Sequence, residues 1–165
     1  MKKRNGTAFG LSLIFIAVFA AATATSAYGA PAYEVGTIFK DVTGKEWVLS
    51  EIRSADKTTT INRVKYISEN MGDFFTVSFQ EDRVAGVGAP NRYFGPYTEG
   101  SNRSLTIGNM ATTMMMAFRE PDELKESEYL AYLSKVTRWD VRDGKLELYT
   151  SNSNGTAVTL VFAPK

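Results

Sequence analysis

The segment RWDVRDGKLELYTSNSNGTAVTLVF, residues 138–162, decides the fold class. Its first half contains Asp143-Gly144, a pair that readily adopts the positive φ angles of a tight primed hairpin turn. After this turn, apolar and polar side chains alternate at the two-residue period of a strand. A second turn ends at Asn154-Gly155, and apolar residues then resume. Two consecutive hairpins therefore predict three antiparallel strands in this segment.

Further strands are expected upstream, where β-branched and aromatic residues mix with polar ones. They lie at residues 46–52, 75–80, 83–87 and 104–110. Residues 53–60 are polar and predict a loop. Residues 61–71 combine helical spacing with β-branched residues, and we expect irregular structure with a short strand there.

One helix is predicted between these strands and the C-terminal hairpins. Pro121 suits a first helical turn, because its missing N–H would have no partner there. Asp122, Glu123 and Glu126 place negative charge near the positive end of the helix dipole. The apolar stripe comprises Leu124, Leu130, Leu133 and Val136. The pattern as a whole predicts an α+β fold, a strongly curved antiparallel β-sheet or partial barrel with one main helix packed across it.

Composition excludes several classes of function. The chain has 165 residues, 44% of them apolar, and it contains no Cys and no His. Ser-His-Asp and Cys-His catalysis, thiolate redox chemistry and the usual zinc sites are therefore excluded. A lipid-anchored lipoprotein needs a modified Cys, so that form is excluded as well. We predict no catalytic residue, no metal and no cofactor.

Residues 1–29 are typical of a secretory signal peptide. Basic residues at positions 2–4 precede an apolar run over 8–22, and Ala27 and Gly29 suit the positions before a cleavage site. The alternative is an uncleaved membrane anchor, because small and apolar residues continue nearly to Ala30; the Thr/Ser-rich stretch 23–26 favours cleavage. We expect export to the periplasm or cell surface, with 30–165 as a single domain and membrane contact only through an uncleaved signal segment.

Charge argues against nucleic acid as a partner. The whole chain carries +1, and without the three basic residues at positions 2–4 it has 16 bases against 18 acids. Nucleic-acid binding needs a concentrated basic face, and the sequence contains none.

The stretch at residues 84–97 resembles the central motif of the META domain family, which includes the HslJ heat-shock lipoprotein. Asn91, Tyr93, Gly95 and Tyr97 fit the family's Gly-Cys-Asn run followed by Tyr-x-Gly-x-Tyr. Residues 113–117 echo its Thr-x-Met-Ala-Cys element. The resemblance implies an exported α+β protein, links to stress or drug tolerance, and no agreed enzymatic activity. It gives a structural role to Trp47, Gly88, Gly95, Thr113, Met115 and Tyr129.

The sequence departs from the family pattern at both Cys positions, which hold Pro90 and Ala117. The absence of both cysteines together is expected if they form a disulfide with each other in other members of the family. The segments around Asn91 and Met115 should then be neighbours, because a disulfide needs Cα atoms about 4.4–6.8 Å apart.

Residues 91–97 are the candidate binding loop. Tyr and Arg are frequent interface anchors, and the candidate contact residues are Asn91, Arg92, Tyr93, Phe94 and Tyr97. The alternative is a structural segment in which both tyrosines pack and the prolines stiffen the chain.

Met114-Met115-Met116 is either a soft binding surface or thioether metal site, or part of the core. We favour core packing, because three consecutive residues of a strand cannot face one way. Acidic residues gather at the predicted helix and at the turn Glu81-Asp82, where solvation and the helix dipole explain them.

These patterns predict a non-enzymatic exported protein that supports envelope stress tolerance by binding an unknown envelope protein or small ligand. The alternatives are an enzyme inhibitor, a carrier of a small apolar ligand, and a carboxylate-based hydrolase.

Export provides the first test. Mass spectrometry of the mature protein should find an N-terminus between Thr25 and Pro31, because the small residues suited to cleavage lie there. A cytoplasmic protein that retains Met1 would contradict the signal-peptide prediction.

Overall fold

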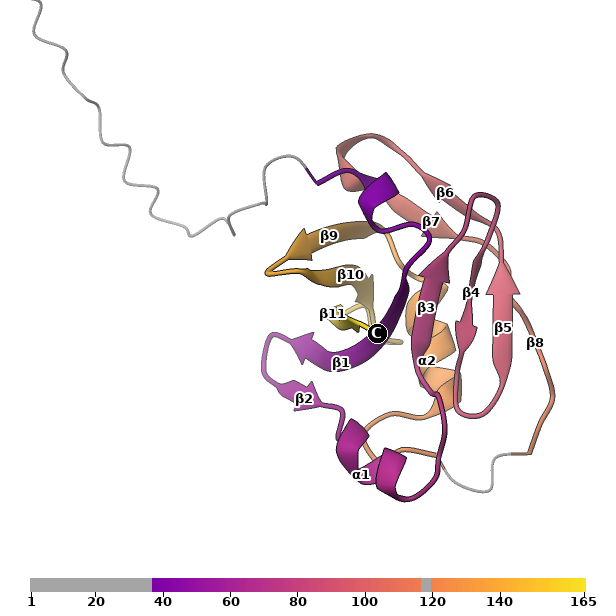
Figure 1. Cartoon of the computed structure of the whole chain (residues 1–165). Helices are drawn as coiled ribbons and strands as arrows, with labels where there is room; N and C mark the ends of the chain where they lie inside the picture. The colour runs from indigo at the N-terminus through magenta and orange to yellow at the C-terminus, as the bar shows by residue number, and fades with distance from the viewer. Residues whose placement is uncertain (1–36, 117–119) are drawn as a thin grey trace, which may run out of the picture. The chain divides into compact units, whose positions relative to one another are not determined.

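The computed structural model describes residues 37–116 and 120–165 (Figure 1). The helical elements are η1 (Phe39–Asp41), α1 (Arg63–Ser68), η2 (Ser101–Arg103) and α2 (Glu126–Leu133). The first strands are β1 (Glu46–Ser54), β2 (Thr58–Thr60), β3 (Thr76–Phe79), β4 (Val84–Val87) and β5 (Arg92–Gly95). The others are β6 (Tyr97–Glu99), β7 (Leu105–Ile107), β8 (Ala111–Thr112), β9 (Arg138–Arg142), β10 (Lys145–Ser151) and β11 (Ala157–Pro164).

One antiparallel sheet contains most of these strands, in the order β8-β5-β4-β3-β1-β11-β10-β9, with β2 paired to β1. Strand β1 joins its two halves, pairing with β3 on one side and with β11 on the other. The β1–β11 register shifts between Leu49 and Glu51, and such a bulge bends a strand. The sheet curves around α2 without closing (Figure 1). The predicted α+β architecture is therefore confirmed.

Both predicted hairpins form. Asp143 and Gly144 have φ angles of 51° and 70°, and Arg142 pairs with Lys145 directly across the turn. In the second turn, the Asn152 side-chain oxygen accepts from the backbone N–H groups of Asn154 and Thr156, both at 2.9 Å. Local turn chemistry thus sets the register of β9, β10 and β11.

Aromatic side chains fill the space between the sheet and α2. The Phe39 ring lies 5.2 Å from Phe79 and 5.1 Å from Trp139 between centroids, so the two halves of the sheet meet at η1. Tyr129 on α2 packs 4.9 Å from the Phe75 ring, and its hydroxyl donates to the Thr76 carbonyl at 2.9 Å. On the other side, the Thr150 hydroxyl donates to the carbonyl of Tyr132 at 2.6 Å. The helix therefore contacts both walls of the curved sheet.

The structure corrects the expectations for residues 53–71. Residues 53–60 are not a loop: β1 continues to Ser54, turns, and pairs with β2. Residues 63–68 form a helix rather than a short strand. The Asn62 side chain caps this helix by accepting the Lys65 N–H at 3.1 Å, while Val64 and Ile67 face solvent and do not oppose it. A cap and the buried Tyr66 outweigh the β-branched preference.

The main helix also begins later than predicted, at Glu126 rather than near Pro121. The Tyr66 hydroxyl accepts the Asp122 N–H at 2.8 Å and donates to the Glu123 carboxylate at 2.6 Å. These bonds hold residues 122–123 against α1.

Within the described residues, no helix has the length and apolar character needed to cross a membrane.

Close packing at Gly86 gives a test of the sheet's inner face. A Cβ at Gly86 would overlap the Thr76 carbonyl oxygen and lie 2.6 Å from the Tyr93 hydroxyl oxygen. We expect Gly86→Ala to lower the free energy of unfolding by about 1–3 kcal/mol, as overpacking does. Urea unfolding measures it. Ala85→Ser, on the opposite face of β4, is the matched control; equal losses in both variants would contradict the packing described.

Candidate functional site

Asn91, at the junction between β4 and β5, binds three segments of the chain together. Its side-chain oxygen accepts from the Met115 N–H at 2.6 Å and from the Thr113 hydroxyl at 2.9 Å. Its side-chain N–H groups donate to the Met115 carbonyl at 3.2 Å and to the Glu126 carboxylate at 2.7 Å. Asn91 is only 9% exposed. This carboxamide is therefore a structural junction and not a free contact residue.

Glu126 completes the junction from the first residue of α2. One carboxylate oxygen accepts the backbone N–H groups of both Ala89 and Asn91, each at 2.7 Å. A Cβ at Gly88 would overlap this carboxylate, so a glycine allows the close approach. We call the Asn91 and Glu126 side chains with these partners the Asn91–Glu126 hub. From the sequence, Glu126 is expected only to interact with the helix dipole. Its hydrogen-bond partners lie 35 to 37 residues away, and no local pattern reveals them.

The predicted binding loop, residues 91–97, consists mainly of strand β5 and ends at the first residue of β6, which corrects the expectation of an exposed loop. Tyr93 is buried, and its hydroxyl donates to the Thr76 carbonyl at 2.7 Å. Tyr97 is partly buried, and its hydroxyl donates to the Gln80 carbonyl at 2.7 Å. Only Arg92 and Phe94 point to solvent, as alternate residues of a strand do.

Most of the residues to which the family resemblance gives a structural role are buried or make contacts that hold the fold. Trp47 and Tyr129 are buried in the core. A Cβ at Gly95 would lie 2.9 Å from the Asn109 carbonyl oxygen. The Thr113 hydroxyl accepts the Arg92 N–H at 3.1 Å and donates to Asn91. The segments around Asn91 and Met115 are neighbours, as predicted; Ala117 lies outside the described residues.

The methionine tract, Met114–Met115–Met116, is exposed. The three residues are 98%, 60% and 93% exposed, so the expectation of core packing was wrong. Strand β8 ends at Thr112, and Asn91 holds the Met115 backbone while all three side chains extend outward. The core interpretation assumed a strand facing the interior, and the tract is neither a strand nor interior.

A shallow groove crosses the outward face of β3, β4 and β5. Its floor contains the small residues Ser78 and Ala85, and its volume is about 470 Å³. Arg83 precedes β4, and Arg92 pairs with Val87 at the other end of that strand. Phe94, which is 54% exposed, borders the groove. We call this feature the outer groove. Within the described part of the chain, the Arg92 guanidinium has no hydrogen-bond or ion-pair partner.

The methionine tract begins beside the outer groove. The Thr113 N–H donates to the Arg92 carbonyl at 3.0 Å, so the chain still follows β5 one residue before Met114. Arg92, the exposed Phe94 ring and the start of the methionine tract therefore lie along one edge of the sheet.

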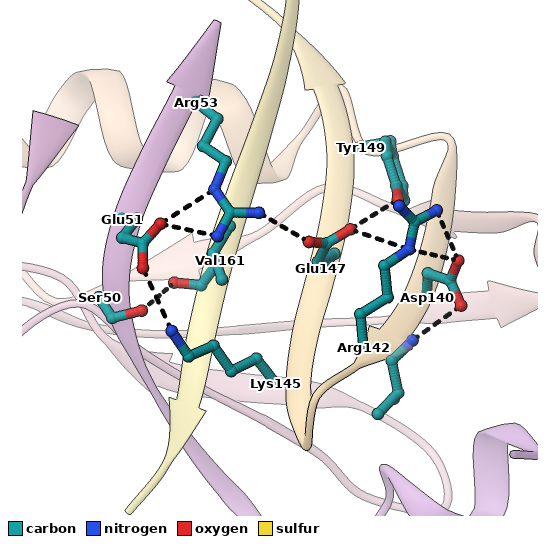
Figure 2. A network of polar contacts seen from close by, with 10 residues as sticks. Ser50, Glu51, Arg53, Asp140, Arg142, Lys145, Glu147, Tyr149 and Val161 are labelled. Carbon is teal, nitrogen blue, oxygen red and sulfur yellow. Dashed lines mark hydrogen bonds and ion pairs between the residues drawn. The ribbon is translucent and has the colours of Figure 1, made fainter. Parts of the chain in front are cut away.

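A network of charged side chains covers the outward face of β1, β11, β10 and β9 (Figure 2). Glu147 accepts from Arg53 at 3.0 Å and from the Tyr149 hydroxyl at 2.7 Å. Asp140, opposite Glu147 on β9, is fully buried and pairs with Arg142 at 3.1 Å and with Arg103. Burial and the Glu147 carboxylate raise the pKa of Tyr149 to about 12. Both carboxylates are thus engaged by cations, which holds the strands in register rather than presenting acids to a substrate.

Metal ligands do not gather in the described residues: no group of three or more His, Cys, Asp or Glu is placed to hold an ion.

A sequence model of the META domain matches residues 40–164. The chain belongs to the META domain family. The structure is similar to the NMR structure of a protein from Burkholderia xenovorans, with a TM-score of 0.56 and 21% identity over 84% of this chain and 97% of that one. A crystal structure of a DUF4847 family protein from Bacteroides vulgatus gives a TM-score of 0.49 and 12% identity, over 77% of this chain and 96% of that one. None of the curated proteins matches the chain significantly.

In this META domain, the central motif has a physical explanation. Asn91 and Thr113 belong to the hub, Tyr93 packs under β4, and Gly95 allows β5 to approach Asn109. These motif residues position the strand, whereas Arg92 and Phe94 lie between them and face outward.

Acid titration tests the charged network of this META domain. The hydrogen bond from Arg53 lowers the pKa of Glu51 below its ordinary 4.5, with Lys145 assisting and partial burial opposing. A lowered folded-state pKa stabilises the protein above the unfolded-state value, and that stability is lost as pH falls through the folded-state pKa. We expect Glu51→Gln to reduce stability at neutral pH and to flatten the loss below about pH 4.5.

Urea unfolding across this pH series measures the effect. Asp56→Asn removes an exposed acid from the adjacent β1–β2 turn and serves as the control. An acid slope that Glu51→Gln leaves unchanged would contradict the role of this network.

Proposed function

We propose that this META-domain protein is exported to the periplasm or cell surface, where it supports envelope stress tolerance by binding a partner and not by catalysis. The observation that carries the proposal is the outer groove, in which Arg92 and the exposed Phe94 flank a floor of small residues, and Arg92 has no ion-pair partner among residues 37–116 and 120–165. The partner that fits is a protein segment with a carboxylate and an adjacent apolar side chain.

The chemistry of the groove supports binding to such a segment. Within the described residues no acid pairs with Arg92, and Glu46, which also lines the groove, is paired with Lys165 at 3.0 Å. A partner's carboxylate can therefore form charge-assisted hydrogen bonds with the guanidinium. Phe94 supplies apolar area that folding leaves in water, and burying it on association is favourable. Ser78 and Ala85 keep the floor low enough for a side chain to lie between the arginines. Arginine and aromatic residues of this kind commonly dominate interface energetics.

The rigidity of the groove also favours binding. The strand that carries Arg92 and Phe94 is paired on both sides, with β4 and with β8. Tyr93, between the two contact residues, is anchored to the Thr76 carbonyl. A preorganised surface loses less conformational entropy on association than a mobile loop would.

The alternatives find less support in the geometry. A carrier of a small apolar ligand needs an enclosed apolar cavity, but aromatic side chains fill the interior, and the outer groove is open with arginines along it. A carboxylate-based hydrolase needs two available acids, and the two acids that are buried among the described residues, Asp140 and Glu147, are both paired with arginines. Export is supported by the signal-peptide pattern at residues 1–29, which lie outside the described residues. The role in stress tolerance follows from the family resemblance.

Quantitative co-purification tests the proposal. Wild-type protein and the Arg92→Glu/Phe94→Ala variant would capture partners from an envelope fraction of stressed cells, with the bound proteins quantified by mass spectrometry. We expect the variant to lose its specific partner about tenfold or more, since an anchor residue typically contributes 2 kcal/mol or more.

The matched control is Lys57→Glu/Val64→Ala, which makes the same kinds of change at exposed positions outside the groove. Undiminished capture by the groove variant, with both variants folded, would contradict binding through the groove.

A further inference from the structure

We propose that the methionine tract is an oxidation site, at which peroxides convert Met114, Met115 and Met116 to sulfoxides while the fold stays intact. This inference goes beyond the proposed function and does not depend on it. The reacting groups are three thioether sulfurs on adjacent residues, and the reactant class is a hydroperoxide.

Accessibility separates the tract from the other described methionines. Met114 and Met116 are almost fully exposed and Met115 is 60% exposed, whereas Met71 and Met110 pack against the hydrophobic core. Oxidation of sulfur follows exposure. The chain has no cysteine, so no thiol within it competes for the oxidant. The tract should therefore react first.

The backbone of the tract is held without any help from the methionine side chains. Asn91 accepts the Met115 N–H and donates to the Met115 carbonyl, and the Thr113 N–H pairs with the Arg92 carbonyl. Each of these bonds uses main-chain atoms of the tract or its approach. Oxidation of the sulfur atoms therefore leaves the hydrogen bonds that position the segment unchanged.

The reaction balances with hydrogen peroxide as the oxidant. A sulfur lone pair attacks one peroxide oxygen, the O–O bond breaks, and an S=O group forms with release of one water. Sulfur loses two electrons and the peroxide gains them. The product is a polar, chiral side chain in place of an apolar one.

The surface consequence is a change of chemistry without a change of charge. Three exposed apolar side chains, in the segment that follows the Thr113–Arg92 backbone hydrogen bond, become three strong hydrogen-bond acceptors. Because the sulfoxides are exposed, methionine sulfoxide reductases can reach them, and the two reductase classes together reduce both epimers. The site is therefore reversible in principle, unlike oxidation of a buried methionine, which disrupts packing.

A peroxide time course with peptide mass spectrometry tests the site on the folded protein, by following the five methionines of the described residues. We expect Met114 and Met116 to oxidise first, Met115 next, and Met71 and Met110 several times more slowly. In urea the five rates should converge, because unfolding removes the difference in exposure. The thermal unfolding midpoint should not change when only the tract is oxidised, and retention on a phenyl column should fall. Both sulfoxide reductases together should restore the mass and the retention.

The control is Met114→Leu/Met115→Leu/Met116→Leu, which keeps apolar side chains but removes the thioethers. Its retention should not respond to peroxide at doses that oxidise the wild-type tract. Equal rates for Met110 and Met114 in the folded protein would overturn the proposal, as would an unfolding midpoint that falls when the tract is oxidised. Retention that oxidation leaves unchanged would overturn it as well. None of these measurements uses a partner, so the proposal fails or stands independently of the outer groove.

Discussion

The hydrogen bonds between Asn91 and Glu126 constrain the rest of the structure. A curved sheet that does not close needs its helix fixed to the walls, or the aromatic core between them opens. Tyr129 and Tyr132 supply the packing, but apolar packing alone does not set the helix's register along the sheet. Directional hydrogen bonds do so: the Glu126 carboxylate accepts the backbone N–H groups of Ala89 and Asn91 at the start of the helix, and the bonds of Tyr129 to Thr76 and of Thr150 to Tyr132 act further along it. A half-buried carboxylate with several donors is stable, whereas the same donors left without it would each cost about 1–3 kcal/mol.

Along the same stretch of chain, the residues that hold the fold alternate with residues that face solvent. Residues that face inward at β5 hold the hub and the core, and the residues between them face the outer groove. The methionine tract repeats the division, with its backbone bound to Asn91 and its side chains in water. The inward residues are therefore fixed by packing and hydrogen bonds, whereas the outward side chains of Arg92 and Phe94 take no part in the core.

The sequence predicted what local chemistry determines. Asp143-Gly144 specified its hairpin because both residues tolerate positive φ. The same reasoning failed at residues 63–68, where the Asn62 cap and the burial of Tyr66 outweighed the preference of Val64 and Ile67. It failed at the methionine tract because the tract was taken to be part of a strand, and the strand ends at Thr112. The hub was beyond local reasoning, since Asn91 contacts residues 24 and 35 positions away. Family resemblance marked Asn91 and Thr113 as special but gave no reason; the shared carboxamide provides one.

A double-mutant cycle between Asn91 and Glu126 tests the central claim most directly. The free energy of unfolding would be measured by urea denaturation for Asn91→Ala, Glu126→Ala and the double variant. Side chains in one hydrogen-bond network couple by about 0.5–3 kcal/mol, and the hub predicts a coupling energy of about 1 kcal/mol or more. Losses that add within about 0.3–0.5 kcal/mol, as for independent sites, would show that the two side chains do not act together and would contradict the account.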